Sequence, residues 1–193
     1  MSIDVNFERI KQSIIKAAEG VRDGRKEPIR KPRVKLSIVK DLQGEVSAGK
    51  FVYRTDAALD AGGFAEHPRP MDLLLGGLAS CQQMWCLRWA ALEGIALTAL
   101  AIETESVFSW RGEYLGEVDS GMQELHVFIT VAGEGMTAQR ICEMADTVAL
   151  RCPVYATLRH ATVVKEVLKV GDALTVEREW QPGQDTARVI SGI

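Results

Sequence analysis

The order of elements along the chain predicts an α+β fold. The 193 residues read as an N-terminal helix followed by two strands, a helix, two strands, a second core helix and a last pair of strands. Strands that come in adjacent antiparallel pairs, rather than alternating with helices, are typical of this class. The first core helix is apolar on nearly all sides, so other elements must cover it. We therefore expect both core helices to lie on sheet faces.

The first 32 residues form a segment of their own. Residues 4–19 carry apolar side chains at spacings of three and four, which predicts an amphipathic helix. Residues 20–32 are rich in glycine, proline and charge, and are typical of a linker. We therefore divide the chain into an N-terminal helix and linker (1–32), a main domain (33–180) and a C-terminal tail (181–193) that is expected to fray.

Two strands are expected at the start of the main domain. Residues 33–40 alternate apolar and polar side chains, and residues 50–55 place two aromatic side chains on one face. Between these strands, residues 43–45 (Gln-Gly-Glu) are interpreted as a turn. Residues 56–69 contain two adjacent glycines and two prolines and are predicted to form a loop.

A long helix is predicted over residues 70–93. Pro70 suits the first helical position because its missing N–H would be unpaired there anyway, and Gly94 supplies the stop. Gly76 and Gly77 lie inside this helix, where a glycine costs roughly 1 kcal/mol relative to alanine. Two adjacent glycines therefore predict that another backbone, from a second helix or a second subunit, approaches closely here.

Four strands and one helix complete the predicted chain. The strands are expected at residues 97–110, 122–132, 161–170 and 173–180, and the helix at 137–151 with Thr137 as its N-cap. The connection 111–121 is glycine-rich and acidic.

Composition and charge exclude several classes of function. The net charge is −3, with acidic and basic residues interspersed, so the clustered basic face of a nucleic-acid-binding protein is not expected. The charged first twenty residues lack the apolar region of a signal peptide. Charges also interrupt the longest apolar stretch, which argues against a membrane span. Four cysteines are too few for a disulfide framework. We therefore expect a cytoplasmic protein with reduced thiols.

Cys81 and Cys152 are the candidate reactive residues. Cys81 lies three turns inside the long helix, beyond the reach of the helix dipole. Its thiolate would need a cation from elsewhere in the fold, ideally an arginine. Cys152 precedes Pro153, which pushes it out of the helical region of backbone space. It would lie near the N-cap of a turn over residues 153–159, where N–H groups could favour a thiolate.

An inert interpretation of the cysteines competes with this one. Free cysteine is among the most buried residue types, and on the residues alone a core position explains Cys81 and Cys152 equally well. The other two cysteines, Cys86 and Cys142, are assigned to the core. The two tryptophans that follow Cys81 on its face of the helix, Trp85 and Trp89, are expected in the core more than in the wall of an apolar substrate site.

A metal site is not expected. The chain has no Cys-x-x-Cys motif, and its three histidines, His67, His126 and His160, lack the spacing of metal ligands. No cofactor is predicted.

Two segments resemble the OsmC/Ohr family. They are residues 70–81 (Pro-Met-Asp-Leu-Leu-Leu-Gly-Gly-Leu-Ala-Ser-Cys) and residues 152–158 (Cys-Pro-Val-Tyr-Ala-Thr-Leu). The resemblance covers roughly residues 33–180. It implies an intertwined homodimer in which antiparallel sheets wrap around two central helices per chain. That arrangement agrees with the close approach predicted at the glycine pair.

The resemblance also implies an activity. Well-studied members are thiol peroxidases that reduce organic hydroperoxides. By this resemblance Cys81 attacks the peroxide and becomes a sulfenic acid, and Cys152 resolves it as a disulfide. A dithiol, notably a lipoyl group on a protein, then restores the thiols. The partners implied are a second copy of the chain, a small organic hydroperoxide and this reductant.

One position departs from the family pattern. In the family peroxidases a glutamate follows the proline at the helix start and orients the activating arginine, whereas here Met71 stands at that position and the acid is Asp72. The candidates for the activating arginine are Arg54 and Arg33. The departure leaves an alternative open: a non-peroxidatic OsmC-like protein that binds a small apolar or thiol-reactive ligand at the dimer interface.

Overall fold

The computed structural model describes residues 3–159, 164–170, 173–180 and 188–192, with side chains described for residues 3–159. Within these residues every strand pairing is antiparallel, as the α+β prediction requires. The helices are α1 (Phe7–Arg22), α2 (Pro70–Glu93), α3 (Ala138–Arg151) and α4 (Pro153–Arg159). The strands are β1 (Lys35–Lys40), β2 (Gln43–Ala48), β3 (Phe51–Thr55), β4 (Leu97–Val107), β5 (Glu124–Gly133), β6 (Val164–Val170), β7 (Ala173–Trp180) and β8 (Arg188–Gly192).

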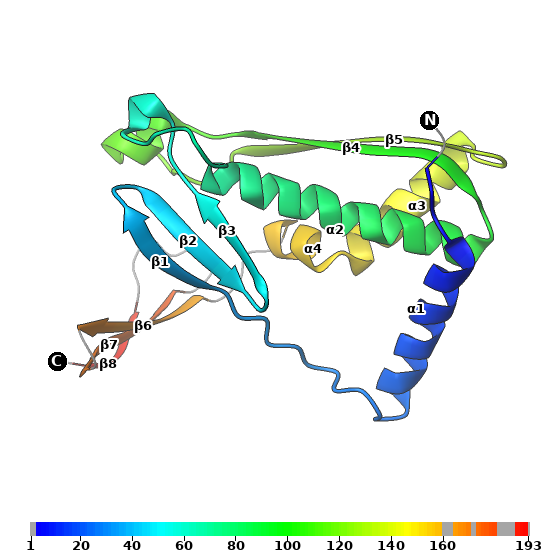
Figure 1. Ribbon diagram of the computed structural model, residues 1–193, viewed down its shortest axis with the longest axis horizontal. Helices are drawn as coiled ribbons and strands as arrows, with labels where there is room; N and C mark the ends of the chain where they lie inside the picture. Colours follow the sequence, from blue (N-terminus) through cyan, green and yellow to red (C-terminus); the bar gives the residue numbers. More distant parts are fainter. Residues whose placement is uncertain (1–2, 160–163, 171–172, 181–187, 193) are drawn as a thin grey trace.

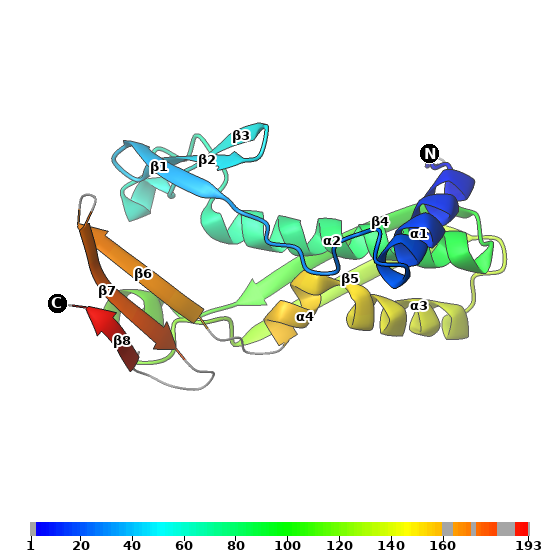
Figure 2. The same ribbon diagram turned by 90° about the horizontal axis from the view of Figure 1, so that it is seen from below.

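The long helix α2 is the centre of the fold. It packs against α1, α3, α4 and β4, and Figures 1 and 2 show the β4–β5 hairpin running along it, with α3 and α4 on another side. Successive strand residues point to opposite faces, so β4 and β5 alternate half-buried and exposed positions. Ile102 and Ile129 pair across the hairpin and pack on the core. Thr104 Oγ1 donates a hydrogen bond to the Leu75 carbonyl, 3.2 Å away, which ties the hairpin to α2.

The ends of the helices follow the predicted signals. α2 runs over the predicted residues, from Pro70 to Gly94, which has the left-handed φ of 71° that glycine tolerates. α3 begins after Thr137, whose side chain accepts a hydrogen bond from Arg140 N. α1 starts later than predicted because Asn6 is its N-cap.

Two predictions of secondary structure are wrong. Residues 43–45 begin β2, which pairs with β1 on one side and β3 on the other. The chain turns instead at Asp41 and Gly49, whose φ angles are 47° and 62°. In the tail, residues 188–192 form β8 against β7 rather than fraying. Residues 181–187 and 193 lie outside the described residues.

A buried aspartate organises the loop that leads into α2. Asp56 is 1% exposed, and its carboxylate accepts hydrogen bonds from the backbone N–H groups of Ala57, Phe64 and Glu66. Gln43 of β2 adds a side-chain hydrogen bond at 3.2 Å. Buried polar groups need such partners, so the loop before α2 is fixed to the β1–β3 sheet.

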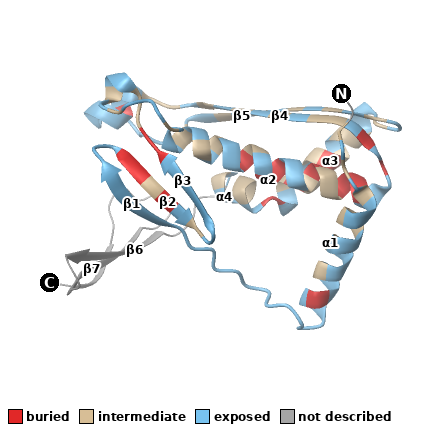
Figure 3. Ribbon diagram, viewed as in Figure 1, coloured by how far each residue is buried: buried red, intermediate tan, exposed pale blue. Residues whose placement is uncertain are grey.

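Burial is greatest on α2 and the elements packed against it, and a smaller buried set lies on β2 (Figure 3). The β1–β3 sheet makes no extensive contact with a described helix. Val46 is buried, but other large apolar side chains of the sheet are exposed: Leu36 by 56%, Ile38 by 79% and Phe51 by 65%. The chain has 14,144 Å² of accessible surface, whereas a compact monomer of 21.2 kDa has about 9,100 Å². The single chain therefore leaves a large apolar surface uncovered.

No helix in the described part of the chain combines the length and the apolar character needed to cross a membrane.

Candidate thiol site

Cys81 lies in the buried core, 7% exposed, in the middle of α2. It belongs to one apolar cluster with Met144 and Val148 of α3 and with Cys152. Apolar residues lie on nearly all sides of α2, so the side of the helix that carries Cys81 can pack in the core. Among the described residues, no hydrogen-bonded cation accompanies it.

Cys152 is fully buried at the junction between α3 and α4. Its φ and ψ of −79° and 110° are extended, as expected for a residue before proline. Cys152 N donates to the Val148 carbonyl at the end of α3, and the Cys152 carbonyl accepts from Ala156 N in α4. The N–H of Tyr155 donates to Cys152 Sγ at 3.4 Å. The predicted N-cap position of this thiol is therefore confirmed.

The two thiols lie in the same buried cluster. Burial, with the neighbouring Cys81 acting in the same direction, raises the pKa of Cys152 to about 11, and the Tyr155 N–H opposes this shift. Cys152 is therefore a protonated thiol at neutral pH, beside Cys81 in an apolar setting.

A third thiol lies beside the pair. Cys86 of α2 is fully buried in the same cluster. Burial, together with a smaller effect of the nearby Cys152, raises its pKa to about 12. The prediction that Cys86 is a core residue is confirmed. The same prediction for Cys142 is wrong, since that thiol is exposed. Met144 and Val148 mark the buried face of α3, and Cys142 lies off it.

Apolar side chains surround the thiols and exclude water. Trp89 is 5% exposed and belongs to the core cluster, as predicted. Trp85 is half-buried and packs against that cluster, with the Arg88 guanidinium over its ring at 4.9 Å. Tyr155 and Val154 of α4 close the side nearest Cys152.

The two candidate arginines lie on or beside the β1–β3 sheet. Arg54 of β3 forms an ion pair with Glu45 of β2 at 3.5 Å. Arg33 is exposed in the segment before β1. Within the described part of the single chain, no hydrogen bond or ion pair joins either arginine to a thiol. Their activating role stays a prediction.

Asp72 is engaged at the start of its own helix. Its carboxylate accepts from Arg69 N at 3.1 Å and pairs with two nitrogens of the Arg69 guanidinium. The hydrogen bond to the Arg69 side chain lowers the pKa of Asp72. The acid that follows Met71 therefore caps α2, as expected for a residue rotated away from the family's glutamate position.

Sequence reasoning missed Gln82. It is 3% exposed on α2, and its Oε1 has no hydrogen-bond partner among the described residues. A glutamine directly after Cys81 in an otherwise apolar helix was the available signal. In the described ranges, no three His, Cys, Asp or Glu side chains are grouped so as to hold a metal ion.

Two of the comparisons with known proteins gave matches. A family model described as OsmC-like protein matches residues 63–167. Among solved structures, an OsmC-like protein from Mycoplasma pneumoniae is 21% identical with a TM-score of 0.60, over 68% of this chain and 89% of that chain. An organic hydroperoxide resistance protein from Elizabethkingia anophelis is 13% identical with a TM-score of 0.54, over 70% and 93%.

A third solved structure, an organic hydroperoxide resistance protein OsmC from Legionella pneumophila, is 16% identical with a TM-score of 0.52, over 69% of this chain and 92% of that chain. At these identities the structural matches show the fold. The search of curated proteins found no match.

Proposed function

Because this chain belongs to the OsmC-like protein family, whose model matches more than half of its residues, we propose that it is a thiol-dependent peroxidase that reduces organic hydroperoxides. The observation that carries the proposal is the placement of Cys81 and Cys152, 71 positions apart in the sequence, in one buried apolar cluster. Two structural neighbours named as organic hydroperoxide resistance proteins support the same class of substrate.

In the first step the Cys81 thiolate attacks the terminal oxygen of the hydroperoxide. An S–O bond forms as the O–O bond breaks, and the leaving alkoxide takes a proton to become an alcohol. The sulfur is oxidised to a sulfenic acid while the peroxide is reduced. The apolar walls favour alkyl peroxides over hydrogen peroxide.

In the second step Cys152 resolves the sulfenic acid. Its sulfur displaces the hydroxyl group of Cys81, the S–S bond forms, and the proton lost by Cys152 leaves with that hydroxyl as water. The two cysteines start from the same buried cluster, so the sulfurs are expected to meet without a large rearrangement. An external dithiol, such as a lipoyl group on a protein, then reduces the disulfide by thiol exchange.

The activating arginine is proposed to come from the β1–β3 sheet of a second copy. Arg54 lies in β3 of that sheet, and Arg33 lies two residues before the start of β1. Several large apolar residues of the sheet are exposed. Gly76 and Gly77 on α2 are also uncovered, because an added Cβ would meet nothing within 4 Å at either. In a homodimer the β1–β3 sheet of one copy would cover the exposed side of α2 in the other copy. This packing would bring an arginine of the sheet to α2.

A second candidate function has one observation in its favour. Asp72 is held by Arg69 and does not replace the glutamate that orients the arginine in the family peroxidases. A family member without that orientation would bind a small apolar or thiol-reactive ligand at the dimer interface instead of reducing peroxides.

Stopped-flow measurement of cumene hydroperoxide consumption by the reduced protein at pH 7 tests the choice. We expect consumption far faster than by free cysteine, a loss of about 100-fold or more in Cys81→Ser, and no change in the matched control Cys142→Ser, whose thiol is exposed. Cys152→Ser should keep the first oxidation but stop at sulfenic acid by mass spectrometry. Wild-type consumption no faster than that of free cysteine would exclude the peroxidase and leave the ligand-binding function.

A further inference from the structure

The N-terminal helix α1 forms one wall of an open cavity beside α2. The cavity has a volume of about 770 Å³, within the 300–1,000 Å³ of small-molecule sites. One wall is the inner face of α1, where Ile10, Ile14, Ala17 and Val21 recur at helical spacing. Neither α1 nor the segment after it lies within residues 63–167. The α1 wall of the cavity therefore lies outside the matched residues, whereas the α2 wall lies inside them.

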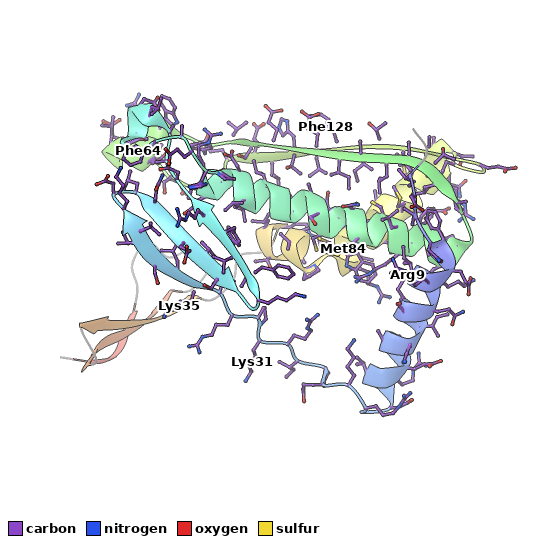
Figure 4. The ribbon with its side chains drawn as sticks, viewed as in Figure 1. Arg9, Lys31, Lys35, Phe64, Met84 and Phe128 are labelled. Carbon is purple, nitrogen blue, oxygen red and sulfur yellow. The ribbon has the colours of Figure 1, made fainter. Side chains whose placement is uncertain are left out.

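The opposite wall belongs to α2. Met84, Trp85 and Leu87 line the cavity, and Figure 4 shows Arg9 on the side of α1 toward α2, with Met84 on the neighbouring side of α2. Trp85 and Leu87 also pack against the cluster that holds the thiols. No cysteine lines the cavity, so it is separate from the thiol site and shares only a wall with it.

The charged residues of the lining are all cations. They come from α1, the segment after it, α2 and the end of α3, and are Arg9, Lys26, Arg30, Arg88 and Arg151. None of the five forms an ion pair within the described part of the chain. No acidic residue lines the cavity, although the whole chain has a net charge of −3. Positive charge is thus concentrated at this apolar cavity.

We propose that this cavity binds a single-chain anionic amphiphile, a free fatty acid. The apolar residues of α1 and α2 would bury the alkyl chain, and the arginines would hold the carboxylate, which the guanidinium fork matches with two hydrogen bonds. The lining residues of α1 run from Arg9 to Val21, about 18 Å along the helix axis, which suits an extended alkyl chain. The proposal stands independently of the peroxidase function.

Calorimetric titration of the reduced full-length protein with laurate, below its micelle concentration, tests the proposal. We expect saturable binding of one laurate per chain, weakened by salt. In the series octanoate, decanoate and laurate each methylene should tighten binding about fourfold, from the transfer free energy of a buried CH₂. Dodecanol, which lacks the charge, should bind at least tenfold more weakly.

Variants test separately how the cations and the volume of the cavity contribute to laurate binding. Arg9→Gln combined with Arg30→Gln should weaken laurate binding at least tenfold. The matched control Arg22→Gln, on α1 but outside the lining, should change it less than twofold. Ala18→Phe adds bulk to the cavity without changing charge and should also weaken binding at least tenfold. Circular dichroism checks that each variant keeps its helices.

Three results of the titrations would overturn the proposal. They are the absence of saturable laurate binding, equal affinity for dodecanol, and equal affinity of the control and the double variant. An affinity that falls as the protein concentration rises would assign the cavity to a second copy of the chain and would also overturn it. Cosedimentation with phosphatidylglycerol vesicles, without laurate binding, would assign the cations to a membrane surface and also contradict it.

Discussion

At the scale of single residues, burial separates the thiols that are expected to stay protonated from the proposed nucleophile. Burial holds Cys152 protonated at neutral pH, with a pKa of about 11. Cys86 is buried as well, with a pKa raised to about 12. Neither is expected to attack a peroxide as a thiolate. Because Cys152 is the proposed partner of the oxidised Cys81, Cys86 is expected to stay reduced.

Asp72→Asn tests the residue-scale account of the helix start. Asp72 pairs with Arg69 at the surface, with the two side chains 42% and 60% exposed, so the variant should lose only about 0.2–1 kcal/mol of stability. Its peroxide rate should equal that of the wild type, because the carboxylate caps α2 instead of orienting an arginine. The control is Asp60→Asn, which should keep the wild-type rate. A rate reduced tenfold or more in Asp72→Asn alone would show that Asp72 contributes to the reaction at the thiols.

The pH dependence of stability checks the same pair. Its hydrogen bond to the Arg69 side chain lowers the pKa of Asp72 from the ordinary 3.8. The stabilisation is therefore present above pH 3.8 and is lost as pH falls through the lowered pKa. Denaturant unfolding between pH 5 and pH 2 should show a smaller loss in Asp72→Asn than in the wild type. Equal losses would contradict the pairing.

At the scale of elements, sequence signals predicted the helices better than the short strands. Pro70 and Gly94 marked both ends of α2, and Thr137 marked the start of α3. Residues 43–45 were misread because Gly44 suggests a turn, whereas it lies in β2 under Leu36, whose Cδ1 is 2.9 Å from the place of an added Cβ. That contact joins two neighbouring strands of one hairpin, and the composition of residues 43–45 alone does not encode it.

The candidate site was predictable only in part, for the same reason. Pro153 indicated that Cys152 leaves the helix, and this was visible in the sequence. The contact of Cys152 with Cys81 depends on how α3 and α4 pack against α2, which no local pattern encodes. The exposure of Cys142 was predictable from the periodicity that buries Met144 and Val148. The sequence could not predict that Gln82 Oε1 would lack a hydrogen-bond partner among the described residues.

Pro153→Ala tests the element that positions Cys152. Alanine would let α3 continue into α4 and draw Cys152 from its extended backbone, with ψ of 110°, into a helical one. Disulfide formation after one turnover should then slow by about tenfold or more, since small misplacements of reacting atoms cost that much. The first oxidation of Cys81 should be unchanged. Unaltered disulfide formation, as expected for the control Pro28→Ala, would contradict the role of the junction.

At the scale of the whole molecule, the accessible surface indicates a missing partner. The chain exposes 14,144 Å², about 5,000 Å² more than a compact protein of its mass. Obligate homodimers commonly bury 2,000–5,000 Å² or more in total. The uncovered surfaces include the β1–β3 sheet and the glycine pair of α2. We therefore expect a second copy of the chain to complete the core.

Gly77→Leu tests the expected dimer. In the single chain the new side chain meets nothing within 4 Å, so helix propensity alone would stabilise the variant by up to about 1 kcal/mol. Against a closely packed second copy it would clash. Light scattering should give twice 21.2 kDa for the wild type and for the control Gln139→Leu, which alters an exposed position of α3, and a single-chain mass for Gly77→Leu. A wild-type monomer would contradict the dimer.

Mapping of the oxidised cysteines tests the central claim of a paired thiol site most directly. The reduced protein is treated with one equivalent of cumene hydroperoxide, trapped with an alkylating reagent, digested and analysed by mass spectrometry. The account predicts one intramolecular disulfide between Cys81 and Cys152, with Cys86 and Cys142 alkylated. Oxidation confined to the exposed Cys142, or a disulfide that leaves out Cys81 or Cys152, would contradict it.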